Sequence, residues 1–153
     1  MKRIEVKLHL PAVAPLLDVV REAADTLGAG LAAPLRLEGL DDEFRAVWEA
    51  DLVAAQNGDV RRLLALFDRE FFSTGTIALD EDNADAVVRA CAAVRLRRRG
   101  QALAAVSDEA RECGSVDPAQ LDAAAARAFM CYVFLATLQE LCLSHLGPAV
   151  PEP

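Results

Sequence analysis

The sequence predicts a mainly α-helical protein, a helical bundle of about five helices with a small two- or three-stranded β-sheet that starts at the N-terminal strand. Three observations predict this fold class. Apolar residues recur at helical spacing over most of the chain, capping residues, glycines and prolines separate these stretches, and apolar and charged residues alternate at the N-terminus. We expect a single domain over residues 1–147 and a short flexible tail over 148–153.

Composition narrows the class of protein further. The 153 residues are 54% hydrophobic, which is enough to build a core. Sixteen basic against 24 acidic residues give a net charge of -8, which disfavours nucleic acid and anionic membrane as partners. Four cysteines without a C-x-x-C pair indicate neither a zinc site nor a secreted disulfide framework, so we expect a cytoplasmic protein. No signal segment is evident, and the uncharged helical run 128–139 is too short to span a bilayer.

The first elements follow from periodicity. Residues 4–10 alternate apolar and polar side chains, which predicts a strand. Helical spacing over about 14–27 predicts a helix that ends at Gly28 and Gly30. Residues 34–39 have room for a second strand to pair with the first, because an isolated strand would leave its backbone groups unpaired.

Three more helices are expected in the middle of the chain. Residues 41–43 supply a cap and first-turn acids for a helix that Asn57-Gly58 closes, and Asp59 starts another that runs to Phe72. A short extended stretch, 76–79, precedes a long helix over roughly 81–105 that Asp80 caps. The first of these helices carries one apolar face, formed by Phe44, Val47, Trp48, Leu52 and Ala55.

The last helix has the clearest start signal. Asp117 is a good N-cap, and Pro118 suits the first helical position. The helix should extend to about Leu146, where Gly147 ends it. The strong apolar character of this helix favours a central position against the helix that starts near residue 81.

Residues that match parts of catalytic, metal-binding or cofactor-binding motifs fit structural roles better. Gly28-Ala29-Gly30 lacks the preceding strand of a dinucleotide site, and Asp80 with its neighbours lacks the glycine and glutamate of a calcium loop. His9 and His145 have no ligand or relay partner at suitable spacing. Cys131 and Cys142 are too far apart along one helix for a disulfide, which makes them small core residues. We therefore expect no enzyme, no catalytic residue, no metal and no cofactor.

One polar cluster stands out. The run 95–99 is the only basic feature on an acidic chain, and it contributes Arg95, Arg98 and Arg99. Arg98 falls in the apolar row of its helix, beside Arg95. Glu140 likewise appears in an apolar row that contains Phe129, Val133, Ala136 and Leu143, with Gln139 and Tyr132 close by.

Buried charges need partners, so we expect Arg95 or Arg98 to pair with Glu140, with Gln139 and Tyr132 completing the hydrogen bonds. Such a cluster serves either structural specificity alone or ligand binding, and the sequence leaves both open.

Two segments together resemble a known family. The segment 79–103 contains R-A-C-x-A-V-R-L, and the segment 131–146 contains Y-x-F-L-x-x-L-Q-E. Their pairing resembles a family of uncharacterised bacterial proteins, domain of unknown function 2017, and a weaker likeness extends from Ile4 to Leu146. The resemblance implies a small, soluble, mainly helical bacterial protein with no established enzymatic activity. Its most recognisable segments include Arg89, Cys91, Arg95, Tyr132, Gln139 and Glu140.

The functional expectation is a non-enzymatic protein-interaction module. High apolar content on a short chain indicates surface left to bury, which favours a homodimer or another protein as partner. The alternative is a small-ligand or anion-binding regulatory protein whose pocket between the two long helices is lined by arginines.

Overall fold

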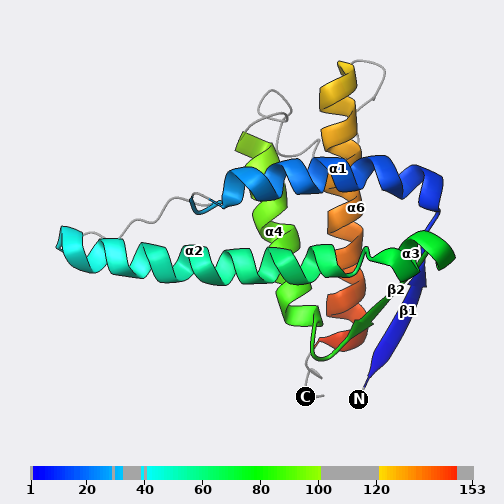
Figure 1. Ribbon diagram of the computed structural model, residues 1–153, viewed down its shortest axis with the longest axis horizontal. Coiled ribbons are helices and arrows are strands. Elements are labelled where there is room, and N and C mark those ends of the chain that lie inside the picture. Colours follow the sequence, from blue (N-terminus) through cyan, green and yellow to red (C-terminus); the bar gives the residue numbers. More distant parts are fainter. Residues whose placement is uncertain (1, 29, 33–38, 40, 101–120, 148–153) are drawn as a thin grey trace, which may run out of the picture.

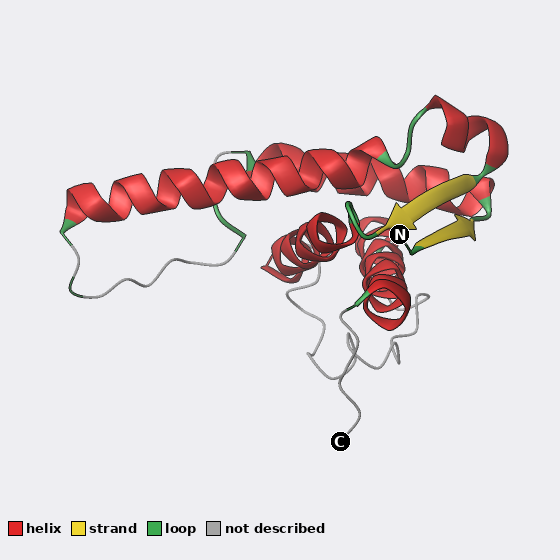
Figure 2. Cartoon of the chain, turned by 90° about the horizontal axis from the view of Figure 1, so that it is seen from below, coloured by secondary structure: helices red, strands yellow, loops and turns green. Residues whose placement is uncertain are grey.

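The helices form two layers, and helices α1 and α2 run across helices α4 and α6 (Figures 1 and 2). The computed structural model describes residues 2–28, 30–32, 39, 41–100 and 121–147. The expected class, a mainly helical protein with a small sheet from the N-terminal strand, is confirmed. In chain order the described elements are β1 (Arg3–Lys7), α1 (Leu10–Leu27), α2 (Asp42–Ala65), α3 (Arg69–Thr74), β2 (Thr76–Asp80), α4 (Ala84–Gly100) and α6 (Ala123–Leu146).

The sheet is a two-stranded antiparallel pair of β1 and β2. Ile4 lies opposite Leu79 and Val6 opposite Ile77, so the apolar side chains of both strands share the inner face. The partner of the first strand is therefore 76–80. Residues 34–38 of the strand expected at 34–39 lie outside the described residues, Gly39 is in a turn, and β2 provides the pairing expected of that strand.

Helix α1 begins at Leu10, four residues before its expected start. Pro11 occupies the first turn, where its missing N–H has no helical partner to lose. The helix ends as expected, at Leu27 with Gly28 as its C-cap. Its buried face contains Val13, Leu16, Leu17, Val19, Val20, Ala23 and Leu27.

Helix α2 is unbroken from Asp42 to Ala65, so the helix end expected at Asn57-Gly58 is wrong. Gln56 explains part of the difference, because its side-chain amide donates to the carbonyl oxygens of Leu27 (3.3 Å) and Gly30 (3.1 Å) and ties α2 to the end of α1. One turn later, buried Val60 and Leu63 keep the chain helical against α4. Packing thus outweighs the low helix propensity of glycine, a penalty of about 1 kcal/mol.

The helix expected over 59–72 is in reality the end of α2 and a separate short helix, α3. Asp68 caps α3 by accepting a hydrogen bond from the N–H of Phe71 at 3.0 Å. Gly75 then ends it with φ of 72°, a left-handed conformation. The carbonyl of Gly75 accepts from the N–H of Leu8 at 2.7 Å, which brings the segment after β1 against the start of β2.

Helix α4 starts at Ala84, three residues after its expected start, because a side-chain turn precedes it. Asp80 accepts hydrogen bonds from the backbone of Asp82 (2.9 Å) and Asn83 (3.0 Å), and Asn83 in turn binds the backbone of Asp80 and Ala78. Asp80 therefore stabilises the turn that precedes α4 and does not cap the helix itself, which begins at Ala84. Residues 101–105 of the expected helix lie outside the described residues.

Helix α6 begins at Ala123, where Asp122 accepts from the N–H of Ala125 at 2.7 Å. The predicted start signal, 117–118, lies outside the described residues, and a continuous helix from there is wrong because residues 121–122 are not helical. The expected end near Leu146 is confirmed. As predicted, α4 and α6 pack together at the centre of the fold.

Helix α6 is also long and apolar enough, by length and composition alone, to cross a membrane. This differs from the expectation for the run 128–139, because the helix extends well beyond that run. A core helix passes the same test, and 33% of the apolar window of α6 is buried; Cys131, Leu135 and Leu138 lie in the main hydrophobic cluster.

Candidate functional site

The predicted polar cluster is real in part, and its centre is Arg95. The guanidinium of Arg95 lies over the ring of Tyr132, 4.3 Å from its centroid. Its Nη1 donates to Oε1 of Gln139 at 2.7 Å, and Nε2 of Gln139 donates to the carbonyl oxygen of Val88 at 3.0 Å. Gln139 therefore links α6 both to the Arg95 side chain and to the backbone of α4. Tyr132, which lies beneath the Arg95 guanidinium, is fully buried.

Arg98 belongs to a different contact. It is buried, with 8% of its surface exposed, and its Nη2 donates to the carbonyl oxygen of Val19 at 2.7 Å. The exposed carboxylate of Glu22 lies 3.8 Å from the same nitrogen. Arg98 thus fastens α4 to α1. The side chain of Arg99 lies outside the part of the structure that is described.

Glu140 is exposed, so its expected pairing with Arg95 or Arg98 is wrong. The helix face turned inward is not the row predicted from the sequence. Phe129 of that row is buried, but Val133 and Leu143 are 40% and 62% exposed. The buried residues of α6 are Ala128, Phe129, Cys131, Tyr132, Leu135, Leu138 and Cys142. Because α6 is apolar on nearly every side, periodicity alone placed the wrong face inward.

The described cysteines are free thiols in the core, as the sequence predicts. Burial raises the pKa of the Cys91 and Cys142 thiols, and it raises the pKa of Cys131 to about 12. Thiols protonated at neutral pH are poor nucleophiles, so these side chains fit packing roles.

The feature that sequence analysis missed is the distal half of α2, residues 42–55, called here the α2 arm. The arm extends well beyond the other helices in both views (Figures 1 and 2). Four large apolar side chains are exposed along it, and we call them the apolar stripe: Phe44 at 56%, Val47 at 57%, Trp48 at 49% and Leu52 at 38%. The sequence predicts these residues to share an apolar helix face. It does not predict that no described element covers this face.

Hollows at either end of α2 differ in character. One lies at the tip, where Asp41, Glu43 and Asp51 surround the aromatic residues of the apolar stripe. The other lies at the base, where Gly58 and Arg62 meet Arg89 of α4. There Arg89 forms a bidentate ion pair with Asp59, at 2.9 and 3.0 Å. The tip of α2 therefore carries large apolar side chains and acids. Its base carries small side chains and arginines.

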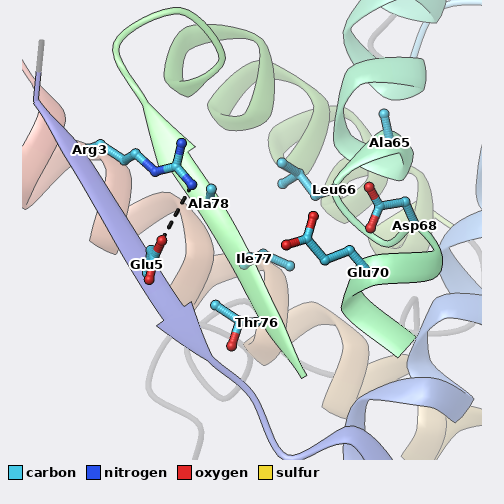
Figure 3. Close-up of a pocket in the computed structure, with 9 residues that line it drawn as sticks. All are labelled: Arg3, Glu5, Ala65, Leu66, Asp68, Glu70, Thr76, Ile77 and Ala78. Atoms are coloured by element: carbon cyan, nitrogen blue, oxygen red, sulfur yellow. Dashed lines mark hydrogen bonds and ion pairs between the residues drawn. The ribbon is translucent and has the colours of Figure 1, made fainter. Parts of the chain in front are cut away.

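A third, polar groove lies between the sheet and the α2–α3 corner (Figure 3). Arg3 and Glu5 of β1 lie on one side of it, 3.4 Å apart, and Asp68 and Glu70 lie on the other. Asp68 already serves as the cap of α3. Among the described residues no cluster of histidine, cysteine or acidic side chains is arranged to hold a metal ion, and none of these three hollows is lined by Arg95 or Arg98.

Comparison with known proteins gives one match. The model of a family described as Domain of unknown function (DUF2017) matches residues 10–146. No curated protein and no solved structure matches the chain. The matched range includes every described helix and leaves out β1.

Proposed function

The chain belongs to the DUF2017 family, and from that premise we propose that it is a non-enzymatic protein-interaction module that self-associates through the α2 arm. The observation that carries this proposal is the apolar stripe on a helix that extends away from the core. Within one chain, no described element covers these side chains.

The size of the stripe supports an interface. Large apolar side chains bury roughly 150–250 Å² for an aromatic residue and somewhat less for Val and Leu, so the measured exposures correspond to on the order of 300 Å² of apolar surface per arm. The largest apolar patch of an ordinary monomer covers about 300–600 Å² and is often functional, so the stripe is large enough to serve as a binding surface. It also exceeds half of the roughly 500 Å² per copy that a specific dimer needs.

The alternative, an anion or small-ligand pocket lined by arginines, has less support. One N–H group of Arg95 donates to Gln139 and one of Arg98 donates to the backbone of Val19, so both arginines have partners within the fold. Arg98 is also nearly inaccessible to solvent. These contacts favour the structural interpretation of the polar cluster.

The three buried free thiols further support placing the protein in a reducing cytoplasm.

Sedimentation equilibrium of the whole chain, from micromolar to several hundred micromolar, tests the proposal. We expect a mass of twice 16.4 kDa at the upper concentrations. Trp48→Asp should weaken association by about thirtyfold or more, the effect of losing a central aromatic anchor. Leu52→Asp and Leu143→Asp form a matched pair, since both replace an exposed leucine, and only the former should weaken association. A wild-type protein that remains monomeric throughout contradicts the proposal.

A further inference from the structure

The partner of the α2 arm can be read from the order of side chains along α2. Residues 18 apart in a helix share one angular position, because 18 residues make five full turns. Phe44 of the tip is therefore aligned with Arg62 of the base. Glu43 is likewise aligned with Arg61, on the flank of the same face, and all four side chains are exposed.

The side chains at the two ends of this face differ in size and are opposite in charge. The tip presents the bulky Phe44 and Trp48, whereas the base presents Ala55 and Gly58. A Cβ built on Gly58 meets no atom closer than the end of the Arg61 side chain at 3.9 Å, so the surface there is open. Acids surround the tip, and arginines surround the base.

A surface whose two ends complement each other is completed by a copy of itself turned end to end. We infer that the occupant of the apolar stripe is a second copy of this chain, with the two α2 helices antiparallel and crossing near Leu52. This inference rests on the proposed self-association and adds its geometry. The overlap of residues 41–62 is about 32 Å long.

This arrangement places each aromatic side chain of the stripe against a small residue. Trp48 lies against Ala55 of the second copy, and Phe44 lies near Gly58 of the second copy. In an antiparallel helix pair the same flank of both helices lies on one side, so Glu43 meets Arg61 of the second copy, twice per dimer. A parallel pair would instead put acid beside acid at the tips and aromatic residues beside aromatic residues, which the charges oppose.

The base of α2 is accessible to such a partner. Val60 and Leu63, the buried residues of α2, lie about 80–160° around the helix from the row that contains Ala55 and Arg62. Asp59 is already neutralised by Arg89 and does not leave a bare carboxylate beside Phe44. A second helix can therefore lie along the whole face without displacing any described core contact.

Cross-linking distinguishes the orientations. Glu43→Cys and Arg61→Cys proteins, purified separately and mixed, are treated with a short bis-maleimide, and the wild-type chain gives the background from its native thiols. We expect covalent dimers mainly in the mixture of the two variants. Covalent dimers that form mainly within each variant alone overturn the antiparallel arrangement while leaving self-association intact. A wild-type chain that does not dimerise contradicts both the antiparallel arrangement and the proposed self-association.

Charge reversal provides an independent measurement by sedimentation. Arg61→Glu should raise the dimer dissociation constant about threefold to tenfold, because two exposed pairs are replaced by repulsion. Adding Glu43→Arg to the same chain should restore wild-type association. Arg69→Glu, which reverses an exposed arginine of α3, is the matched control and should change nothing. Equal dissociation constants for Arg61→Glu and wild type contradict the inference, as does association weakened by Arg61→Glu that Glu43→Arg fails to restore.

Discussion

Gln139→Leu tests the contact between α4 and α6 most directly. The replacement keeps the volume of the side chain and removes the acceptor for Arg95 and the donor for the carbonyl of Val88, which lie 2.7 and 3.0 Å from it. Each buried donor or acceptor that is left without a partner lowers the stability of the folded protein by about 1–3 kcal/mol. Since Gln139 is only half-buried, we expect a loss of about 2 kcal/mol in the free energy of unfolding.

The assay is equilibrium urea denaturation followed by circular dichroism, with thermal melting alongside. A loss of about 2 kcal/mol corresponds to a Tm lower by about 4–8 °C for a chain of this size. Glu140→Leu is the matched control, because it introduces the same residue one position later, where the side chain is exposed. We expect it to change stability by less than about 0.5 kcal/mol. Two variants with equal stability would refute the assignment of Gln139 as the link between α4 and α6.

Two other perturbations test the turn and the thiols. Gly75→Ala should lower the free energy of unfolding by about 1–2 kcal/mol in the same assay, because φ is 72° and an added Cβ would meet the carbonyl oxygen of Leu8 at 3.0 Å; an unchanged value contradicts the strain argument. The pKa of Cys131 is raised in the folded state to about 12, so its contribution to stability is full below pH 8.5 and falls as pH rises toward 12, by about 1.4 kcal/mol per pH unit. Cys131→Ala should therefore show a shallower loss of stability than wild type between pH 8.5 and 10.5, and parallel curves for the two proteins would exclude burial of the thiol.

Local signals in the sequence predicted most of the architecture. Alternation identified the first strand, glycine identified the end of α1, and the apolar character of the last helix predicted its position beside α4. Each of these signals is set by residues close together in the chain, so no knowledge of the tertiary contacts was required. The boundaries that were wrong depend on distant residues: α2 continues past Gly58 because Gln56 binds the end of α1.

The polar cluster was predicted in composition but not in its pairs. Arg95, Tyr132 and Gln139 do meet, because helical spacing put them on facing sides of α4 and α6. Glu140 does not join them, since a helix with apolar residues on all sides gives no indication of which neighbour faces inward. The exposure of the apolar stripe could not be predicted from the sequence for a related reason. Helical periodicity identifies an apolar face of a helix, but it does not show which other element covers that face.

The placement of the two unique aromatic residues has a spectroscopic consequence. The chain contains one tryptophan and one tyrosine. Trp48 lies about 22 Å along α2 from the buried Leu63, on the arm and half exposed, whereas Tyr132 is enclosed between α4 and α6. Tryptophan emission therefore responds directly to what covers the arm, while the tyrosine signal responds directly to the contact between α4 and α6. A single optical titration can thus follow docking and folding as separate events, without any label.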